Sequence, residues 1–161
     1  MKKCIFVFTN ISVFLMMCGF AHASISNQCS EETGPCECPY WDGAHEVHCY
    51  GGWCDDLKLV CDNQGFTVLG AQWTDYTYSG EMHCPPGYFV TQMDCDGGWC
   101  SGVALNCVFV ALTATDCAWT DWFSEEDPNY GECPDHDYIE GIECSGARCD
   151  NMRLNCCDYG L

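Results

Sequence analysis

The chain has 161 residues, of which 18 are Cys, 24 are Asp or Glu and only five are Lys or Arg, and its formal net charge is −19. So negative a field repels phosphate backbones, which excludes nucleic acid as a partner, and it disfavours anionic membrane surfaces. Apolar residues make up 48% of the chain, too many for a disordered acidic tail. The length fits a single domain.

The first 23 residues have the pattern of a secretory signal peptide. Lys2 and Lys3 precede a mostly apolar run, and the segment 21–23 (Ala-His-Ala) supplies the small residues that a signal peptidase reads. Residues 24–161 are then one secreted, extracellular domain with a formal charge of −21 and 16 of the 18 Cys. An even number of Cys in an oxidising compartment predicts up to eight disulfides, and we expect no metal and no cofactor. Zinc, the rival use of clustered Cys, belongs mainly in reducing compartments.

Three blocks of four Cys share one spacing, in which successive Cys are 11, 5 and 7 positions apart. The blocks begin at Cys38, Cys84 and Cys133. In each block a Pro follows the first Cys, a Gly comes two residues after the second, and a Leu comes two residues before the fourth. Self-similarity of this kind indicates copies of one structural unit, which cover about 24–61, 73–107 and 119–157.

Short β-rich segments predict an all-β protein. They lie at 66–69, 88–91, 103–108 and 108–112, with Gly, Pro, Asp and Asn between them, and no stretch keeps a helical period. Three small sheets bury one face poorly alone, whereas packing around a common axis produces one shared core. We therefore expect a pseudo-threefold β-prism of three disulfide-pinned repeats, with a β-trefoil as the alternative. Trp73, Trp119 and Trp122 are expected to fill the core together with the repeated Leu.

The spacing within each block also suggests the disulfide pairing. Cys-Asp-Gly-Gly-Trp-Cys at 95–100 has the composition of a hairpin with a tight tip, and Cys residues flanking such a tip can face each other across two strands. The expected bonds are Cys49–Cys54, Cys95–Cys100 and Cys144–Cys149 at the tips, and Cys38–Cys61, Cys84–Cys107 and Cys133–Cys156 outside them. Spacing alone leaves the first-to-third and second-to-fourth pairing open. It also leaves four Cys without an assigned partner: Cys29, Cys36, Cys117 and Cys157.

The repeat resembles that of the vitelline membrane outer layer protein 1 family. The resemblance rests on Trp-x-x-Trp, Cys-Pro, Gly and Asp-Asn-x-x-Leu-x-Cys in order, and the third unit, 119–157, matches best. It implies a β-prism of three sheets that is secreted, disulfide-bonded and placed in extracellular coats, with a carbohydrate-related role. The present chain departs from the family in its shorter Cys-x-Gly-x-x-Cys tips, which replace longer loops.

The three hairpin tips are the candidate ligand-binding sites. Trp53 and Trp99 occupy equivalent positions in two tips, and Arg148 occupies that position in the third. An indole on a constrained Gly-rich tip is suited to stack on a sugar ring, enter a membrane interface or meet a protein partner. The alternative is that each indole folds back over its own disulfide and sheet.

Support for other chemistry is weaker. Asp94-Cys-Asp96-Gly and Asp135-His-Asp137 are fragments with oxygen ligands suited to calcium, but neither completes a known loop. No His lies in a nucleophile motif, and carboxylate pairs are uninformative in so acidic a chain. The sequence therefore leaves enzymatic activity undecided, and it favours a protein without catalytic residues.

The function that we expect is that of a secreted binding or structural protein of an extracellular layer, with carbohydrate or a matrix component as its partner. The alternatives are a membrane-attaching module or toxin component, whose partner would be a membrane surface, and a carbohydrate-active enzyme.

Overall fold

The computed structural model describes residues 5–6, 16–17, 23–63, 65–126 and 128–160. Most of the expected signal peptide lies outside this range. Two short strands of that segment, β1 (Ile5–Phe6) and β2 (Met16–Met17), pair with each other. In the described part the regular structure is all strand apart from three one-turn 3-10 helices, so the all-β prediction is confirmed. These turns are η1 (Pro39–Trp41), η2 (Gly52–Cys54) and η3 (Ala147–Cys149).

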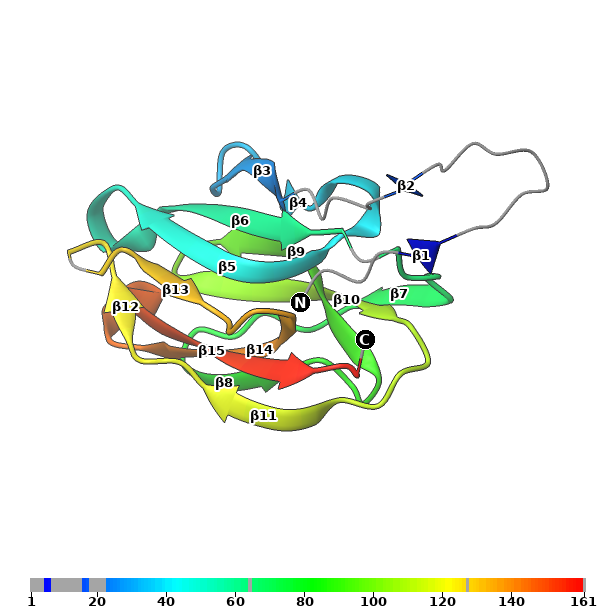
Figure 1. Ribbon diagram of the computed structural model, residues 1–161. Helices are drawn as coiled ribbons and strands as arrows, with labels where there is room; N and C mark the ends of the chain where they lie inside the picture. Colours follow the sequence, from blue (N-terminus) through cyan, green and yellow to red (C-terminus); the bar gives the residue numbers. More distant parts are fainter. Residues whose placement is uncertain (1–4, 7–15, 18–22, 64, 127, 161) are drawn as a thin grey trace.

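Each of the three repeats contributes one long hairpin, and each hairpin is the centre of a sheet (Figure 1). The hairpins are β5 (Gly43–Tyr50) with β6 (Asp56–Asp62), β9 (Tyr88–Asp96) with β10 (Gly102–Phe109), and β14 (Asp137–Ser145) with β15 (Asn151–Asp158). The second strand of each hairpin pairs with the strand that precedes the hairpin in the same part of the chain. The pairs are β3 (Ala23–Cys29) with β6, β7 (Gly70–Trp73) with β10, and β11 (Thr115–Trp119) with β15. The short strand β12 (Phe123–Ser124) also pairs with β15. The three sheets therefore share one plan.

The outer strand on the other side of each hairpin comes from a different repeat. β4 (Cys36–Glu37) of the first unit pairs with β9 of the second, β8 (Gly80–His83) of the second pairs with β14 of the third, and β13 (Tyr130–Glu132) of the third pairs with β5 of the first. This exchange closes on itself, so every sheet contains backbone from two repeats. No unit completes its own sheet.

The first Cys of each block stands at the crossing between two sheets. Its backbone N–H donates to the neighbouring repeat: Cys38 to Thr91 O at 2.8 Å, Cys84 to Glu140 O at 2.7 Å and Cys133 to His45 O at 2.8 Å. The Pro that follows each of them then accepts a turn hydrogen bond from the N–H three residues later, at 2.9–3.0 Å. The recurring Cys-Pro pair thus marks the point where the chain leaves one sheet and turns into the next.

The core lies between the three sheets and includes the repeated Leu residues, because Leu59, Leu105 and Leu154 are all fully buried. A second, aromatic cluster adjoins it, in which Phe89, Tyr138 and Tyr159 pack together. One prediction about the core and one about a strand are wrong. Trp73 and Trp122 are 44% and 40% exposed and Trp119 is half-buried, because these residues lie on outer strands or the loops beside them. The segment 66–69 forms no strand, although Phe66 packs against the aromatic cluster.

Eight disulfides cross-link the domain. Six lie within the four-Cys blocks and join the first Cys to the fourth and the second to the third: Cys38–Cys61, Cys49–Cys54, Cys84–Cys107, Cys95–Cys100, Cys133–Cys156 and Cys144–Cys149. The four Cys that the spacing left unassigned form Cys29–Cys36 and Cys117–Cys157. Seven of the bonds lie within one repeat, and the eighth joins Cys157 of the third repeat to Cys117, two residues before that repeat begins. No disulfide joins two different repeats among the described residues, so backbone pairing and the core hold the exchanged strands in place.

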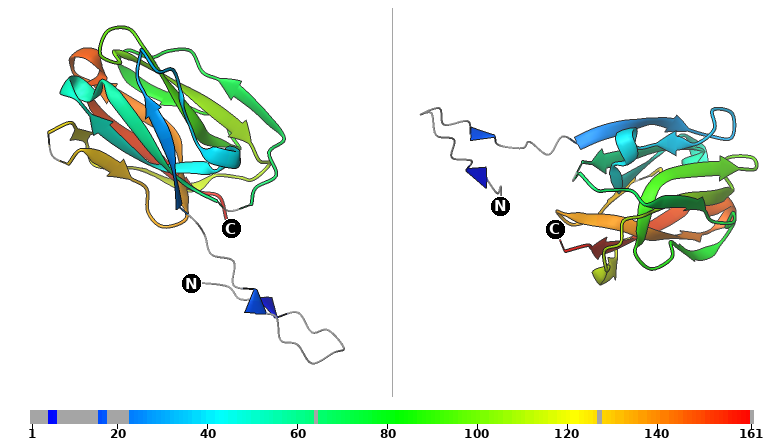
Figure 2. Two further views of the ribbon diagram at one scale, coloured as in Figure 1. Left: turned by 90° about the horizontal axis from the view of Figure 1, so that it is seen from above. Right: turned by 90° about the vertical axis from the view of Figure 1, so that its right-hand side faces the viewer.

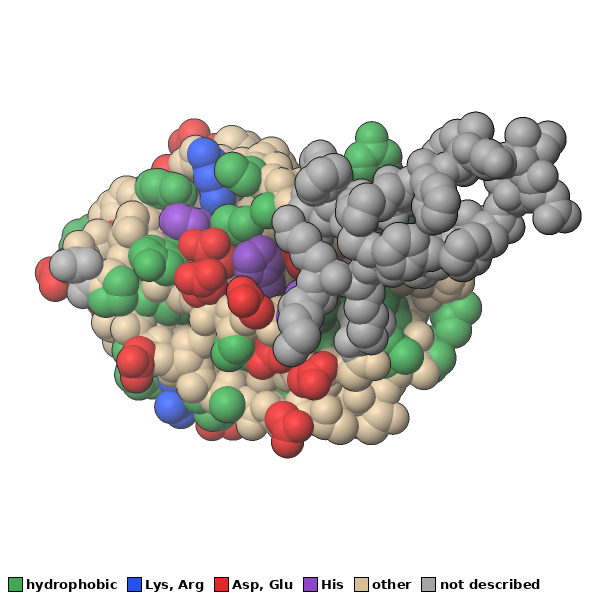
Figure 3. Space-filling model, in the orientation of Figure 1, with side chains coloured by type: hydrophobic (Ala, Val, Ile, Leu, Met, Phe, Trp, Pro, Cys, Tyr) green, Lys and Arg blue, Asp and Glu red, His purple; other side chains and the backbone are tan. Residues whose placement is uncertain are grey.

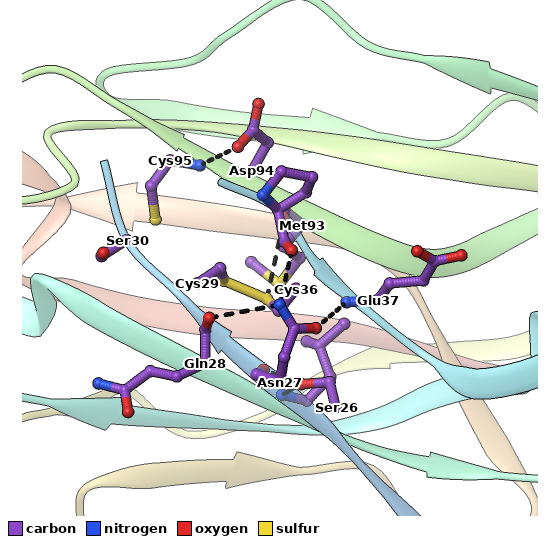
Figure 4. The surroundings of a disulfide bond; sticks show 12 residues. Ser26, Asn27, Gln28, Cys29, Ser30, Cys36, Glu37, Met93, Asp94 and Cys95 are labelled. Atoms are coloured by element: carbon purple, nitrogen blue, oxygen red, sulfur yellow. Dashed lines mark hydrogen bonds between the residues drawn. A yellow bond between two sulfur atoms is a disulfide. The ribbon is translucent and has the colours of Figure 1, made fainter. Parts of the chain in front are cut away.

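The Cys29–Cys36 bond closes the loop that carries the chain from β3 to β4 (Figure 4). Asn27 reinforces this loop, because its Nδ2 donates to Pro35 O at 3.0 Å and its Oδ1 accepts from the Glu37 N–H at 3.1 Å. Since β4 pairs with β9, the disulfide and the Asn27 hydrogen bonds also fix the position at which the first repeat contacts the second.

Candidate ligand-binding site at the hairpin tips

The three hairpin tips have the same backbone path. Each begins at a Gly with positive φ (Gly51, Gly97 and Gly146) and then places two consecutive residues other than Gly in the left-handed region. In the first tip these are Trp53 and Cys54, with φ of 62° and 54°. The Cys that ends each left-handed pair is the one bonded across the hairpin. Such a backbone is costly for side chains with a Cβ, and the disulfide is well placed to hold it.

The leading Gly is required by space as well as by φ. A Cβ on Gly51 would collide with Oδ1 of Asp55, one on Gly97 with Oγ of Ser101, and one on Gly146 with Oδ1 of Asp150. In each tip the polar side chain four residues after the Gly packs against the Gly backbone. These contacts hold the residue between them, Trp53, Trp99 or Arg148, in one position.

The three tips meet at one end of the molecule, where η2 and η3 lie side by side, away from the C-terminus (Figures 1 and 2). The ring centroids of Trp53 and Trp99 are 5.6 Å apart, with the ring planes at 70°. The guanidinium carbon of Arg148 lies 3.8 Å from the ring centroid of Trp99 and 4.9 Å from that of Trp53. We call these three residues the tip cluster.

The tip cluster remains open to solvent. The two indoles are 46% and 45% exposed, and Arg148 is half-buried between them. The indoles of Trp53 and Trp99 belong to different repeats and contact each other. They therefore do not fold back only over their own sheets, which was the alternative expectation. An exposed apolar patch held in one shape is typical of a binding surface.

Every Lys and Arg of residues 24–161 lies over an aromatic ring. Besides Arg148, Lys58 Nζ lies 5.4 Å from the ring centroid of Tyr50, and the Arg153 guanidinium carbon lies 4.7 Å from Trp119 and 4.9 Å from Trp122. The acidic side chains are far more numerous and are spread over the surface, as on the face that bears β5 and β13 (Figure 3). The few cations are thus held at fixed places on a negative surface.

Asp55 is the least well satisfied acid near the tips. Among the described residues its buried Oδ1 has no hydrogen-bond partner. Burial, with the charge of Asp56 as the next cause, raises the pKa of Asp55 above its usual range. At the equivalent place in the third tip, Asp150 Oδ1 accepts from Asn151 Nδ2 at 3.1 Å, and the second tip has Ser101 instead.

The carboxylates of the first calcium-like fragment, Asp94 and Asp96, accept hydrogen bonds from Tyr hydroxyls. Asp94 accepts from the Tyr76 hydroxyl at 2.6 Å, and Asp96 accepts from the Tyr78 hydroxyl at 2.9 Å. The Asp94 hydrogen bond is the main cause that raises the pKa of Tyr76 to about 12. Within the described ranges no group of three His, Cys, Asp or Glu side chains is arranged to hold a metal ion.

An exposed group of aromatic residues, separate from the buried aromatic cluster, lies on the outer face of the β14 sheet and was not predicted from the sequence. Arg153 on β15 lies between the indoles of Trp119 and Trp122 and pairs with Glu143 on β14. His83 on β8 packs edge-on against Trp119 with 5.6 Å between ring centroids, and its Nδ1 lies 2.7 Å from a Glu140 oxygen. The signal for this group in the sequence is the Trp-x-x-Trp pattern, whose residues are expected in the core.

None of the described helices is long and apolar enough to cross a membrane. No family model, curated protein or solved structure matches the chain, so its function has to be argued from the chain's own residues.

Proposed function

We propose that this protein is a secreted, non-catalytic β-prism of an extracellular layer that binds neutral carbohydrate through its tip cluster. The single observation that carries the proposal is the meeting of Trp53, Trp99 and Arg148 from three repeats in one partly exposed group. The resemblance to the vitelline membrane outer layer protein 1 family is part of the same proposal.

The cyclic strand exchange supports the β-prism arrangement. Three sheets on one plan, each completed by the preceding repeat, are expected when three equal units close around a common axis. The alternative β-trefoil also has three units. In both folds three equivalent hairpin tips can meet at one end of the molecule. Three separate sheets, two with four strands and one with five, favour the prism.

The chemistry of the tip cluster favours a sugar. The apolar C–H face of a pyranose fits the face of an indole, while hydroxyl groups need polar partners at the edge of the ring. Arg148 supplies donors beside both indoles, and Asp150 supplies an acceptor in the same tip. Because disulfides and left-handed backbone fix the tips before binding, little conformational entropy remains to be lost.

The charge of the domain restricts the ligand further. At a formal −21 for residues 24–161, sulfated or carboxylated glycans would be repelled, whereas a neutral glycan would not. The Arg148 guanidinium interacts with the rings of Trp53 and Trp99, so its positive charge does not form a separate binding site for an anion. We therefore expect neutral or amino-bearing sugars to bind and anionic ones to fail.

A glycan array and a liposome flotation assay on the secreted protein test the proposal. We expect array signal for neutral glycans, no flotation with phosphatidylcholine vesicles, and about tenfold weaker glycan binding in Trp53→Ala plus Trp99→Ala. Trp73→Ala is the matched control, because Trp73 is equally exposed at 44% and lies outside the tip cluster.

Each alternative has its own signature in these assays. Flotation that the double variant abolishes, without glycan binding, would establish a membrane-attaching module instead. Turnover of a chito-oligosaccharide that a single Asp→Asn or Glu→Gln change stops would establish an enzyme. Glycan binding that survives the double variant would refute the tip cluster as the site.

A further inference from the structure

We propose that Trp119 is an acceptor for a C-linked hexose, attached to C2 of its indole in the secretory pathway. The inference rests on the secretion that the proposed function includes, and it concerns a surface separate from the tip cluster.

The first observation is the pattern Trp119-Thr-Asp-Trp122. Secretory-pathway C-mannosyltransferases of eukaryotic cells accept the first Trp of Trp-x-x-Trp. Of the six Trp in the chain, Trp119 alone has another Trp three residues later. The equivalent place in the second repeat reads Trp73-Thr-Asp-Tyr76, so the chain contains its own near-match. A short motif is a hypothesis that its structural context has to support.

The structure supplies that context. Trp119 ends the outer strand β11, and neither it nor Trp122 belongs to the buried core. Both indoles contact Arg153, with guanidinium-to-centroid distances of 4.7 Å and 4.9 Å, on the outer face of the β14 sheet. A bulky, solubilising sugar is tolerated at a surface and not in a packed core. The surface position of Trp119 is therefore compatible with the modification.

The neighbours of Trp119 suit a sugar once it is attached. Arg153 pairs with Glu143, and His83 pairs with Glu140, all close to this indole. The hexose hydroxyls can donate to these carboxylates and accept from Arg153. We expect the sugar to cover the apolar surface of Trp122, which is 40% exposed without it.

The reaction balances without an oxidant or reductant. The donor is a polyprenyl-phosphate hexose. The electron-rich C2 of the indole attacks C1 of the hexose, a C–C bond forms, and the C1–O bond to the phosphate breaks. Polyprenyl phosphate leaves with the electron pair, and the proton on C2 is lost to a base of the transferase, which restores the aromatic ring.

The test is peptide mass spectrometry on the full-length chain secreted from cells that contain the transferase and from cells in which it is deleted. We expect the peptide with Trp119 to carry one hexose residue only in the first cells, with fragmentation that leaves the sugar on the Trp. Trp122→Phe keeps an aromatic ring beside Arg153 and should lose the hexose, whereas Trp73→Ala should keep it. Tyr76→Trp completes the motif in the second repeat and should add a hexose at Trp73.

The outcomes separate the two proposals. Protein in the medium with an unmodified Trp119 overturns this inference and leaves the proposed secretion standing. Protein that stays inside the cell overturns both. A hexose that persists in Trp122→Phe or in the transferase-deleted cells shows that some other sugar linkage is present, and it too overturns the assignment.

Discussion

The guanidinium carbon of Arg148 lies 3.8 Å from the ring centroid of Trp99, although 49 positions of the chain separate the two residues. Trp53, from a third tip, completes the contact at 4.9 Å. This cation therefore contacts side chains from the tips of both other repeats.

Replacing Arg148 should loosen the tips. In Arg148→Ala the two indoles lose the cation between them, and we expect a loss of about 1 kcal/mol in the free energy of unfolding. Urea denaturation of the oxidised protein, followed by Trp fluorescence, measures the loss. Arg148→Lys keeps the charge and should retain part of the stability; if alanine and lysine variants were as stable as the original, the contact would contribute nothing.

Gly97 and Gly98 provide a matched pair in the second tip. Gly97 has φ +74°, and a Cβ there would meet Ser101 Oγ, so Gly97→Ala should destabilise the domain by about 1–2 kcal/mol. Gly98 has no atom near the place of a Cβ, so Gly98→Ala should be nearly neutral. Thermal unfolding of the two variants compares them directly, and equal melting temperatures would contradict the prediction.

Asp55→Ser should stabilise the protein at neutral pH. Burial raises the pKa of Asp55, so its contribution to stability is present at acid pH, below its ordinary pKa, and is lost as the pH rises through the higher folded value. Serine removes a buried oxygen without a partner, and Ser101 shows that a serine fits this place in the second tip.

The gain from Asp55→Ser should therefore be present at pH 7 and shrink at acid pH, as measured by urea denaturation at both values. Asp150→Ser is the control, because Asp150 has its hydrogen bond from Asn151 and its removal should bring no gain. A gain that did not depend on pH would show that the carboxylate charge is not its cause.

The phenol of Tyr76 should ionise at a higher pH than an ordinary Tyr. Its hydrogen bond to Asp94 raises its pKa to about 12, so the stability that this contact provides is complete below pH 10 and is lost as the pH rises toward 12. Ultraviolet titration should include a Tyr transition near this pKa, and Asp94→Asn should shift that transition to lower pH. An unchanged titration curve in Asp94→Asn would refute the assignment to Asp94.

Much of the local structure follows from the sequence. The repeated spacing predicts three hairpins with short tips, because a Gly-containing segment of four residues between two Cys has the composition of a tight turn. Leu59, Leu105 and Leu154 recur at one place in each repeat and are all buried. The repeated Trp were misplaced because the spacing does not show which face of a strand is covered, and Trp73 lies on an outer strand.

The sequence by itself determined that the domain is built from three copies of one β unit, because the same Cys spacing recurs three times with Pro, Gly and Leu at fixed places in each copy. Only the tertiary structure decided that β4, β8 and β13 pair with another repeat, and that Trp53, Trp99 and Arg148 meet. The physical reason is that these contacts join segments far apart in the chain. A local pattern can specify a strand or a turn, but its distant partner depends on how the three units close.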